Sequence, residues 1–349
     1  MKVVVTGASG NVGTALLRRL AEEPRIRSVV GIARRPVENG PGAATWVQAD
    51  LARDDATDVL RGADVVVHLA WLFHPTRHPQ VTWENNVIGT QRLLDAVDRA
   101  EVPALVVASS VGAYAPRRDL SPVSEEWPTT GAPTAAYSRE KAYVERLLDV
   151  FEARHGDVRL VRMRPGFIFQ DSSAVQQRRL FLGPFVPHAL LRRGRLPVVP
   201  LPRGLQIQAL HSSDAAEAYA AAVLQPVHGA FNLAADPPLD VPTLARLLRS
   251  RPVQVPVPAV RAALQAAFTA HAVPASPGLF DLAMSVPMMS TERARRELGW
   301  QPTYDAEATV DAFLDGLANP AGGATPPLAP ETSGTLRSHE VSTGLGERP

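Results

Sequence analysis

The chain of 349 residues contains no cysteine, which excludes disulfide bonds, thiol catalysis and cysteine-based metal sites. Its formal net charge is only +1, and no cluster of Lys and Arg forms a stripe that could follow a nucleic acid. No stretch approaches the roughly 20 apolar residues of a membrane span, and the apolar run at the start is too short for a signal peptide. Hydrophobic residues make up 45% of the chain, so we expect a globular cytoplasmic protein that binds neither nucleic acid nor membrane.

The first twenty residues carry the most informative pattern. A β-branched run at Lys2–Val5 predicts a buried strand, and Ala15–Leu20 has the pattern of one face of a helix. Between them lie Gly7, Gly10 and Gly13, which would allow a tight turn, the approach of a cofactor and close packing of helix on strand, respectively. A strand that turns through glycines into a helix presents N–H groups and the positive helix end to a pyrophosphate. This context predicts a dinucleotide site; the alternative is a glycine-rich turn of some other α/β protein.

Apolar runs that predict strands alternate with segments of helical periodicity along the first half of the chain. The expected strands are Arg27–Ala33, Thr45–Gln48, Val65–Leu69, Ala104–Ala108 and Leu160–Met163, and the expected helices are Glu84–Ala100 and Tyr137–Arg154. This alternation predicts an α/β fold with a doubly wound parallel sheet and right-handed crossovers. Ligands of such sheets bind at the carboxyl ends of the strands.

The regular alternation ends near residue 170. We expect helices at Ser213–Leu224, Val241–Leu248, Thr291–Leu298 and Ala306–Leu317 and a strand at Phe231–Leu233, with Ser212 or Ser213 capping the first helix and Gly299 following the third. The pattern predicts a nucleotide-binding domain at 1–170, with contributions from 205–235, and a smaller mixed α/β substrate-binding lobe at 171–318. Residues 319–349 lack apolar periodicity and are predicted to be a disordered tail. We expect a small-molecule substrate in the cleft between the two parts.

The residues that follow the second and third expected strands bear on the choice of cofactor. An NAD enzyme usually has an acidic residue at the end of the second strand, where it binds the ribose 2′-hydroxyl. Here Arg34 and Arg35 occupy that place, and two guanidinium groups suit a 2′-phosphate. We therefore favour NADP(H) over NAD(H), although NAD stays open because an arginine pair at a strand end is also common on solvated surfaces. Asp50 is interpreted as an acceptor for the adenine amino group or, alternatively, as a turn residue.

Tyr137 and Lys141 lie four residues apart, which places both on one face of the expected helix. A tyrosine phenol titrates near pH ~10 and is a poor base at neutral pH unless nearby positive charge favours the phenolate. With Lys141 and an oxidised nicotinamide beside it, Tyr137 could exchange a proton with an alcohol or a carbonyl. Ser110 follows a predicted strand and could hydrogen-bond the same oxygen, whereas hydride transfer would belong to the cofactor. The pattern predicts an oxidoreductase.

These motifs occur in one order along residues 2–317, where the chain resembles the extended short-chain dehydrogenase/reductases, also called the NAD-dependent epimerase/dehydratase family. The matching segments are Thr6 to Gly13, Asp50-Leu51, His68-Leu69-Ala70, Asn86 to Thr90, Ser109-Ser110 with Tyr114, Tyr137 to Lys141, His211 to Ala216 and Leu298 to Pro302. The resemblance implies a Rossmann-type fold and a catalytic set of Ser110, Tyr137 and Lys141. It also implies a dinucleotide held by Gly7, Ser9, Gly10, Asn11, Val12, Gly13, Arg34, Arg35, Asp50, Leu51, Leu69, Ala70, Asn86, Tyr137, Lys141 and Pro165.

Departures from the family pattern narrow the expected reaction. Val111 and Gly112 stand where the dehydratases of the family have Asp-Glu, and neither can move a proton. Sugar-nucleotide epimerases commonly hold the substrate pyrophosphate with an asparagine and an arginine. The segment 162–170 contains no asparagine, and Ile207 stands in place of the arginine, although Arg203 is near enough to substitute. These differences argue against dehydratase chemistry and weaken the case for an epimerase.

Large apolar side chains stand near the expected nicotinamide end of the site. Trp71 replaces a small residue of the family pattern, and Phe73 and Phe167 could add to an apolar pocket. These residues favour a less polar carbonyl or alcohol over a sugar nucleotide. We therefore expect an NADP(H)-dependent oxidoreductase acting on a hydroxyl or carbonyl carbon.

Two other functions stay open. The first is a sugar-nucleotide epimerase that uses tightly held NAD(H) without net redox change. The second is a non-catalytic, cofactor-sensing protein, against which the intact Ser110, Tyr137 and Lys141 argue. The resemblance also makes a homodimer plausible. No metal is expected, because His74 and His78 have no carboxylates near them in the sequence.

Overall fold

A seven-stranded sheet forms the centre of the computed structural model, which describes residues 1–73, 78–182, 193–273, 275–319 and 322–329. Its strands are β1 (Lys2–Thr6), β2 (Ser28–Ala33), β3 (Thr45–Gln48), β4 (Val65–His68), β5 (Ala104–Ala108), β6 (Arg159–Pro165) and β11 (Gly229–Leu233). They lie in the order β11-β6-β5-β4-β1-β2-β3, and every neighbouring pair is parallel. The chain winds outward in both directions from β1, which confirms the predicted doubly wound fold and opens a crevice at the carboxyl ends of β1 and β4.

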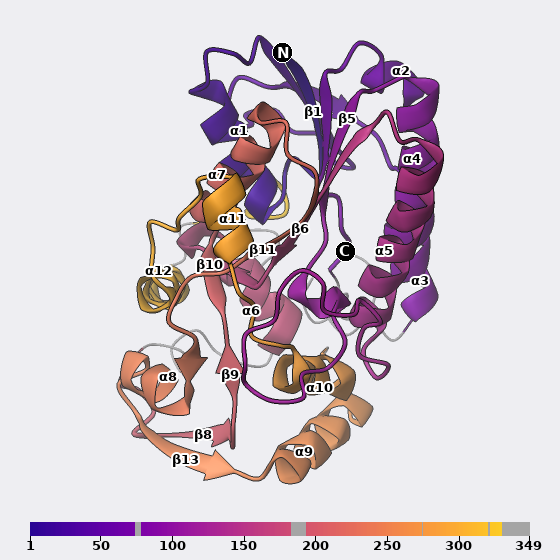
Figure 1. The fold of residues 1–349 in the computed structure, drawn as a ribbon. Helices are drawn as coiled ribbons and strands as arrows, with labels where there is room; N and C mark the ends of the chain where they lie inside the picture. The colour runs from indigo at the N-terminus through magenta and orange to yellow at the C-terminus, as the bar shows by residue number, and fades with distance from the viewer. Residues whose placement is uncertain (74–77, 183–192, 274, 320–321, 330–349) are drawn as a thin grey trace.

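Helices cover both faces of this sheet (Figure 1). One face carries α1 (Asn11–Ala21), α7 (Ser212–Leu224) and α11 (Glu292–Glu297), and the other carries α2 (Thr57–Leu60), α4 (Gly89–Arg99) and α5 (Ala136–Arg154). Val3 and Val5 belong to the first core and Val4 to the second, because successive side chains of a strand point to opposite faces. The β-branched run that predicted a strand is therefore buried on both sides, as is typical of parallel sheets.

A smaller lobe lies below the carboxyl edge of the sheet in Figure 1. Its helices are α6 (Ala174–Leu182), α8 (Val241–Leu247), α9 (Val257–Thr269), α10 (Pro277–Ser285) and α12 (Ala306–Ala318). Its short strands pair as β7 (Phe167–Phe169) with β10 (Ala209–His211), β9 (Gln206–Ile207) with β12 (Leu239–Asp240), and β8 (Val198–Pro202) with β13 (Arg251–Val255). None of the helices in the described ranges is both long enough and apolar enough to cross a membrane.

The helix expected at Glu84–Ala100 is interrupted. The chain forms α3 (Pro79–Trp83), then a π-helical turn at Glu84–Ile88, and only then α4. The side chain of Asn86 in this turn makes two hydrogen bonds to the backbone of Leu72. Its Oδ1 accepts from the Leu72 N–H at 2.6 Å, and its Nδ2 donates to the Leu72 carbonyl at 3.1 Å. Turns of this kind often lie at functional sites. Apolar periodicity alone does not distinguish such a turn from a regular helix.

The N-terminus of α7 also differs from the prediction. The capping residue is His211, whose Nδ1 accepts from the N–H of Ser213 at 3.3 Å, so the expected cap by Ser212 or Ser213 is wrong. The His211 ring stacks on that of Tyr304, with centroids 4.0 Å apart. This contact between segments far apart in the sequence holds the imidazole in the capping position. Gly299 follows α11 with φ +63, as its predicted place after that helix requires.

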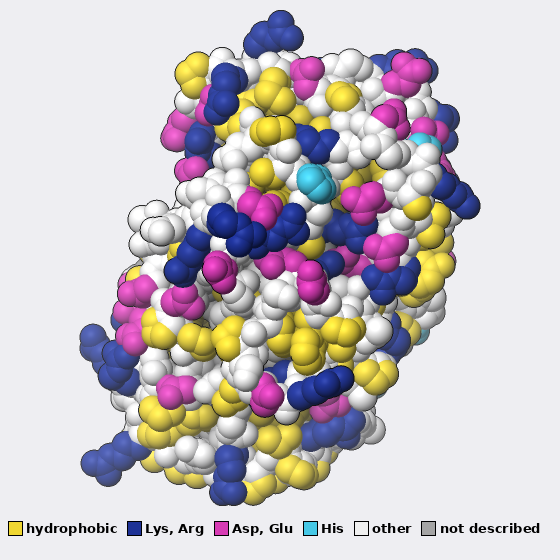
Figure 2. Space-filling model, viewed as in Figure 1, with side chains coloured by type: hydrophobic (Ala, Val, Ile, Leu, Met, Phe, Trp, Pro, Cys, Tyr) yellow, Lys and Arg dark blue, Asp and Glu magenta, His cyan; other side chains and the backbone are white. Residues whose placement is uncertain are grey.

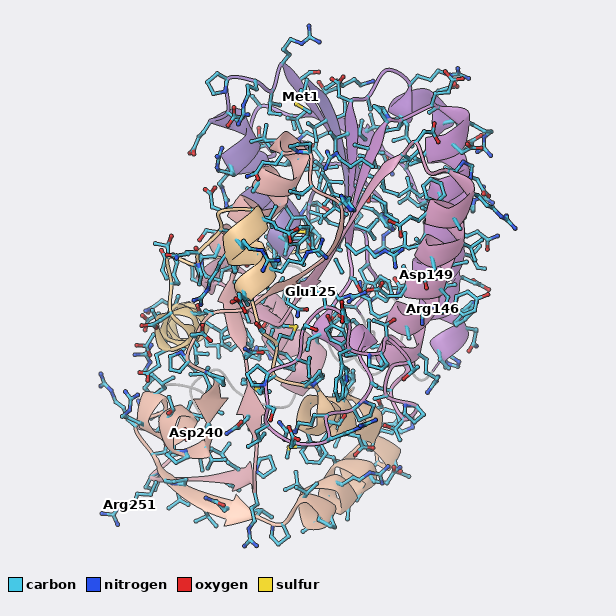
Figure 3. The ribbon with its side chains drawn as sticks, in the orientation of Figure 1. Met1, Glu125, Arg146, Asp149, Asp240 and Arg251 are labelled. Atoms are coloured by element: carbon cyan, nitrogen blue, oxygen red, sulfur yellow. The ribbon has the colours of Figure 1, made fainter. Side chains whose placement is uncertain are left out.

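A buried ion cluster joins α5 to β6. Glu145 is fully buried, lies 3.2 Å from Arg162 and 2.8 Å from Arg164, and accepts from the Ser109 hydroxyl at 2.6 Å. Burial opposes the charge of Glu145, but the arginines and the serine together hold its pKa below the ordinary value. In contrast, Arg146 and Asp149 form a partly exposed pair on α5 at 2.7 Å (Figure 3).

Removing the charge of Glu145 should destabilise the fold. Glu145→Gln leaves the buried guanidinium of Arg164 without its counter-charge and removes one of the three carboxylates that face Arg162, so we expect a loss of about 3–5 kcal/mol in the free energy of unfolding. Urea denaturation measures it. The matched control is Glu152→Gln, because Glu152 also pairs with Arg162, at 2.7 Å, but its side chain is 44% exposed. The control should lose less than about 1 kcal/mol; equal losses in the two variants would contradict the prediction.

Candidate functional site

A cavity of about 740 Å³ runs along the carboxyl edge of the sheet and extends to α9 and α10. The sequence-predicted residues that line it are Gly7, Ser9, Gly10, Asn11, Val12, Gly13, Arg34, Arg35, Asp50, Leu51, Leu69, Ala70, Ser110, Tyr137, Lys141 and Pro165. These residues come from the ends of several strands and the starts of α1 and α5, so the parallel sheet is what brings them together. A cavity of this size is within the range of small-molecule and cofactor sites.

The glycine turn between β1 and α1 forms one wall. Gly7 has φ +66, and a Cβ placed on it would lie 2.6 Å from the backbone nitrogen of Ala70. A Cβ on Gly13 would lie 2.4 Å from the carbonyl oxygen of Gly7. No side chain fits at either position, so the turn depends on glycine there. The N-terminus of α1 consequently opens into the cavity, and this arrangement fits a dinucleotide pyrophosphate.

Asn11 lines the cavity, but its side chain is held by the protein. Its Oδ1 accepts from the Gln170 amide at 2.5 Å and from the Ser212 hydroxyl at 2.8 Å. These bonds tie the glycine turn to the segments before α6 and α7. The Oδ1 atom of Asn11 is therefore engaged within the protein.

Arg34 and Arg35 follow β2, and both are exposed on the cavity wall. Arg34 also donates a long hydrogen bond, of 3.4 Å, to the side chain of Asn85. Asp50 follows β3 and accepts from the N–H of Ala52 at 3.2 Å, so it has a turn role in addition to facing the cavity. Two cations beside one carboxylate suit the ribose and adenine end of a dinucleotide.

The ammonium group of Lys141 is buried beneath the cavity floor. Its Nζ donates to the Ala108 carbonyl at 2.7 Å and lies 3.4 Å from the centre of the Trp71 ring. Burial lowers the pKa of Lys141 to about 7, while the carboxylates of Glu145 and Glu140 act in the opposite direction. Burial thus disfavours the charged form of Lys141, and the two carboxylates favour it.

Tyr137 and Ser110 meet on the same floor. Burial raises the pKa of Tyr137 to about 12, and its hydrogen bond with Ser110 acts against that shift. Ser110 Oγ accepts from the N–H of Gly112 at 3.0 Å, so its own proton can be donated to an oxygen in the cavity. A Cβ on Gly112 would lie 2.7 Å from the Tyr137 ring, so glycine makes room for the phenol. The hydroxyls of Ser110 and Tyr137 and the ammonium of Lys141 line one cavity and could together exchange a proton with a bound oxygen. Positions 111 and 112 carry no acidic side chain.

Asn86 does not line the cavity, contrary to the expectation that it holds the cofactor. It is 1% exposed and braces Leu72, and its Nδ2 also donates to the Glu140 carboxylate at 2.7 Å. Glu140 in turn accepts from the hydroxyl of Thr82 at 2.5 Å. Asn86 therefore supports the wall on which Trp71 and Leu72 lie rather than touching its contents.

His68 does not extend the site. His68 is 4% exposed and lies between the hydroxyls of Thr6 and Thr90, at 2.7 and 3.0 Å. Burial lowers its pKa to about 3, so it is a neutral packing residue. His74 lies outside the described residues. Within the described ranges, no group of three His, Asp or Glu side chains is arranged to hold a metal.

Part of the segment predicted to be a disordered tail lies against the glycine turn. Thr325 Oγ1 donates to the carbonyl of Ser9 at 2.7 Å, and Leu328 is only 2% exposed. Pro326 and Pro327 line the cavity. Contacts with distant residues order this short stretch, which is why apolar periodicity did not reveal it. Residues 320–321 and 330–349 lie outside the described part of the chain.

The sequence patterns also did not predict the wall of the cavity that the smaller lobe forms. Side chains of α6, α9 and α10 supply it, among them Leu180, Leu264, Leu279 and Leu282. None of these three helices was predicted. α9 has no buried residue and therefore no core-facing stripe, which is the signal that such a prediction needs.

Comparisons with known proteins agree with this architecture. Residues 3–234 match the model of the NAD dependent epimerase/dehydratase family. "Uncharacterized protein Rv2047c" of Mycobacterium tuberculosis is 28% identical over 320 residues, which are 90% of this chain but 30% of that protein. The chain thus spans about a third of that relative's length.

Two further matches bear on the chemistry of this fold. A 4-hydroxy-2-methyl-3-oxo-4-farnesyl-3,4-dihydroquinoline-1-oxide ketoreductase of Stigmatella aurantiaca is 31% identical over 178 residues, 48% of this chain and 51% of that protein. The structure of a UDP-glucose-4-epimerase from Stenotrophomonas maltophila with bound NAD has a TM-score of 0.69 at 20% identity and covers 91% of this chain and 98% of its own. At that identity the second match shows a shared fold.

The buried Lys141 should make the stability of the ligand-free protein depend on pH. In the unfolded chain its pKa is ~10.4, whereas burial lowers its pKa to about 7 in the folded protein. The unfolded state therefore binds more protons between these values, so stability should rise with pH from about 7 towards 9. Urea denaturation at several pH values measures the slope. Lys141→Met should be more stable than the wild type at pH 7 and lack this part of the slope; an unchanged slope would contradict the prediction.

Proposed function

The chain belongs to the NAD-dependent epimerase/dehydratase family, and from that membership we propose that it is a nicotinamide-dependent oxidoreductase acting on a hydroxyl or carbonyl carbon. The observation that carries this proposal is the meeting of Ser110, Tyr137 and Lys141 on the floor of the cavity that the glycine turn also lines. The ketoreductase that shares 31% identity over half of this chain supports carbonyl chemistry.

The proton steps follow from the positions of these three side chains. A bound nicotinamide supplies or accepts the hydride. Ser110 donates its hydroxyl proton in a hydrogen bond to the substrate oxygen and so orients it. Tyr137 gives its proton to that oxygen during reduction and takes it back during oxidation. Lys141 in its ammonium form stabilises the phenolate, and the positive charge of an oxidised nicotinamide favours the phenolate further.

We further propose that NADP(H) is preferred to NAD(H). Arg34 and Arg35 lie on the cavity wall beside the end of β2, where a ribose 2′-phosphate would be placed. Guanidinium groups bind phosphate through paired, charge-assisted hydrogen bonds. No acidic residue stands directly after β2 to accept from a free 2′-hydroxyl.

A sugar-nucleotide epimerase is the second candidate. The structural neighbour from Stenotrophomonas maltophila is such an enzyme with bound NAD, and it shares the fold. Ser110, Tyr137 and Lys141 would serve an epimerase equally well, so these residues do not separate the two functions. They do argue against a non-catalytic cofactor sensor, because a sensor needs the pocket but not the proton-exchanging groups.

A homodimer stays a prediction. Ile88, Tyr143 and Val150 are 38%, 45% and 49% exposed, and two of them lie on α5. Association through α4 and α5 would cover these apolar side chains.

Tyr137→Phe tests the catalytic assignment. Removal of the phenol should lower kcat for ketone reduction by about 10²–10⁴-fold, while the affinity for NADPH should change little because the ring remains. Oxidation of NADPH, followed by its absorbance with a panel of ketones and aldehydes, measures the rate. Full activity of the variant on any substrate that the wild type turns over would show the assignment to be wrong.

Arg34→Asp tests the choice of cofactor. The wild-type protein should bind NADPH more tightly than NADH, and the variant should lose most of this preference because a carboxylate repels the 2′-phosphate. Calorimetric titration with both dinucleotides measures it, and Arg27→Asp, away from the cavity lining, is the matched control. NAD(H) that co-purifies and does not exchange would favour the epimerase instead.

A further inference from the structure

The end of the cavity that adjoins Tyr137 has apolar walls. Phe73 and Trp71 approach the Tyr137 ring edge-on, with centroids 5.0 and 5.8 Å away. Leu264 of α9 and Leu279 of α10 face the same cavity from the smaller lobe. A substrate whose oxygen reaches Ser110 and Tyr137 must therefore pass its remaining atoms along aromatic and aliphatic side chains.

Charge is distributed unevenly along this cavity. Among the described residues that line it, the charged side chains are Arg34, Arg35 and Asp50, beside β2 and β3, and Lys141, on the floor. The described lining residues of α6, α9 and α10 carry no charge. Two glutamines of α6, Gln176 and Gln177, also line the cavity. The amide of Gln177 is engaged, because it donates to the carbonyl of Ile168 at 2.9 Å and to Ser173 at 3.2 Å. Gln176 brings an uncharged amide, which can hydrogen-bond a ketone oxygen but cannot neutralise a phosphate.

Two described arginines of the smaller lobe that could pair with a substrate phosphate do not line the cavity. Arg193 pairs with Asp311 and Asp315, both at 3.1 Å, and does not line the cavity. Arg203 does not line it either. A diphosphate brought to the apolar end would lose its hydration without gaining a cation from the described lining residues of α6, α9 and α10, which is strongly unfavourable.

The smaller lobe also presents apolar surface that the fold itself leaves uncovered. α9 reads VPAVRAALQAAFT, and none of its residues is buried. Hydrophobic side chains gather over the lower part of the molecule in Figure 2, the region of this lobe. Leu264 thus lies on an accessible helix and still faces the cavity, so an apolar ligand would gain contact area by covering it.

We propose that the substrate is an uncharged, predominantly apolar ketone, or the corresponding secondary alcohol, whose hydrocarbon body lies against α9 and α10. This inference rests on the proposed oxidoreductase function. In the reduction direction the carbonyl carbon receives hydride from NADPH, which becomes NADP⁺, and the carbonyl oxygen receives the Tyr137 proton, which solvent then replaces. The apolar walls exclude water from the reacting carbon.

Binding to the full-length Tyr137→Phe variant loaded with NADPH tests the substrate class without requiring turnover. The probes are benzylacetone and decalone, two uncharged ketones, and UDP-glucose, measured by calorimetry. Both ketones should bind, and UDP-glucose should bind at least about tenfold more weakly. Tighter binding of UDP-glucose, or no binding of either ketone, would overturn the proposal.

Leu264→Asp in the same background locates the binding site. Ketone affinity should fall at least about tenfold, because the variant replaces an apolar contact with a charged side chain. The affinity for NADPH should stay unchanged, which would show that the variant is folded. The control is Val253→Asp, since Val253 is 51% exposed on β13 and does not line the cavity. Equal effects of the two variants would overturn the assignment.

Turnover by the wild-type protein distinguishes a failure of the proposed substrate class from a failure of the proposed oxidoreductase function. If the ketones bind as expected but no NADPH is oxidised with them, and none of the corresponding secondary alcohols is oxidised with NADP⁺, the redox function is wrong and only the apolar binding site stands. Reduction of polar, phosphorylated carbonyl compounds in preference to the ketones would support the redox function and overturn the substrate class.

Discussion

A buried ammonium group, that of Lys141, is the constraint around which the site is built. Placing this cation out of water is unfavourable, as its lowered pKa shows. The Ala108 carbonyl at the end of β5 and the face of Trp71 after β4 partly offset that cost. Both partners come from the carboxyl edge of the sheet, and the lysine comes from a crossing helix. The contacts that stabilise the Lys141 ammonium therefore form only when α5 packs against the sheet. The protonation state of the candidate site thus depends on the assembled fold.

One face of α5 connects this charge to the rest of the protein. Tyr137, Lys141 and Glu145 follow one another at intervals of four residues, so they line a single face of the helix. Tyr137 reaches the cavity, Lys141 lies beneath it, and Glu145 anchors the helix to β6 through Arg164. Glu145 also accepts from Ser109, the neighbour of Ser110, and so fixes the loop that carries the orienting hydroxyl. One face of α5 thus carries the buried ion cluster at one end and the candidate proton-exchanging groups at the other.

The sequence predicted those parts of the molecule that local chemistry determines. The β-branched run Lys2–Val5, the glycine turn and the spacing of Tyr137 and Lys141 were informative because strand, turn and helix each impose a short-range pattern. The π-helical turn at Glu84–Ile88 and the His211 cap depend on contacts with Leu72 and Tyr304, far away in the chain. The same is true of Thr325 against Ser9 and of the wall formed by α9. Long-range contacts of this kind leave no periodic trace.

The distribution of charge in the cavity separates the candidate functions better than the catalytic side chains do. Reductase and epimerase chemistry both need a proton-exchanging phenol, a nearby cation and an orienting hydroxyl. They differ in what occupies the second half of the cavity: an epimerase of sugar nucleotides must accommodate a diphosphate there, and a ketone reductase need not. Since the described walls of α6, α9 and α10 offer aliphatic and aromatic side chains and two glutamine amides but no cation, the free energy of transfer from water favours a hydrocarbon over a diphosphate at that end. In the proposed reductase the lobe that packs below the sheet would therefore select the substrate, whereas the sheet edge would supply the groups for proton and hydride exchange.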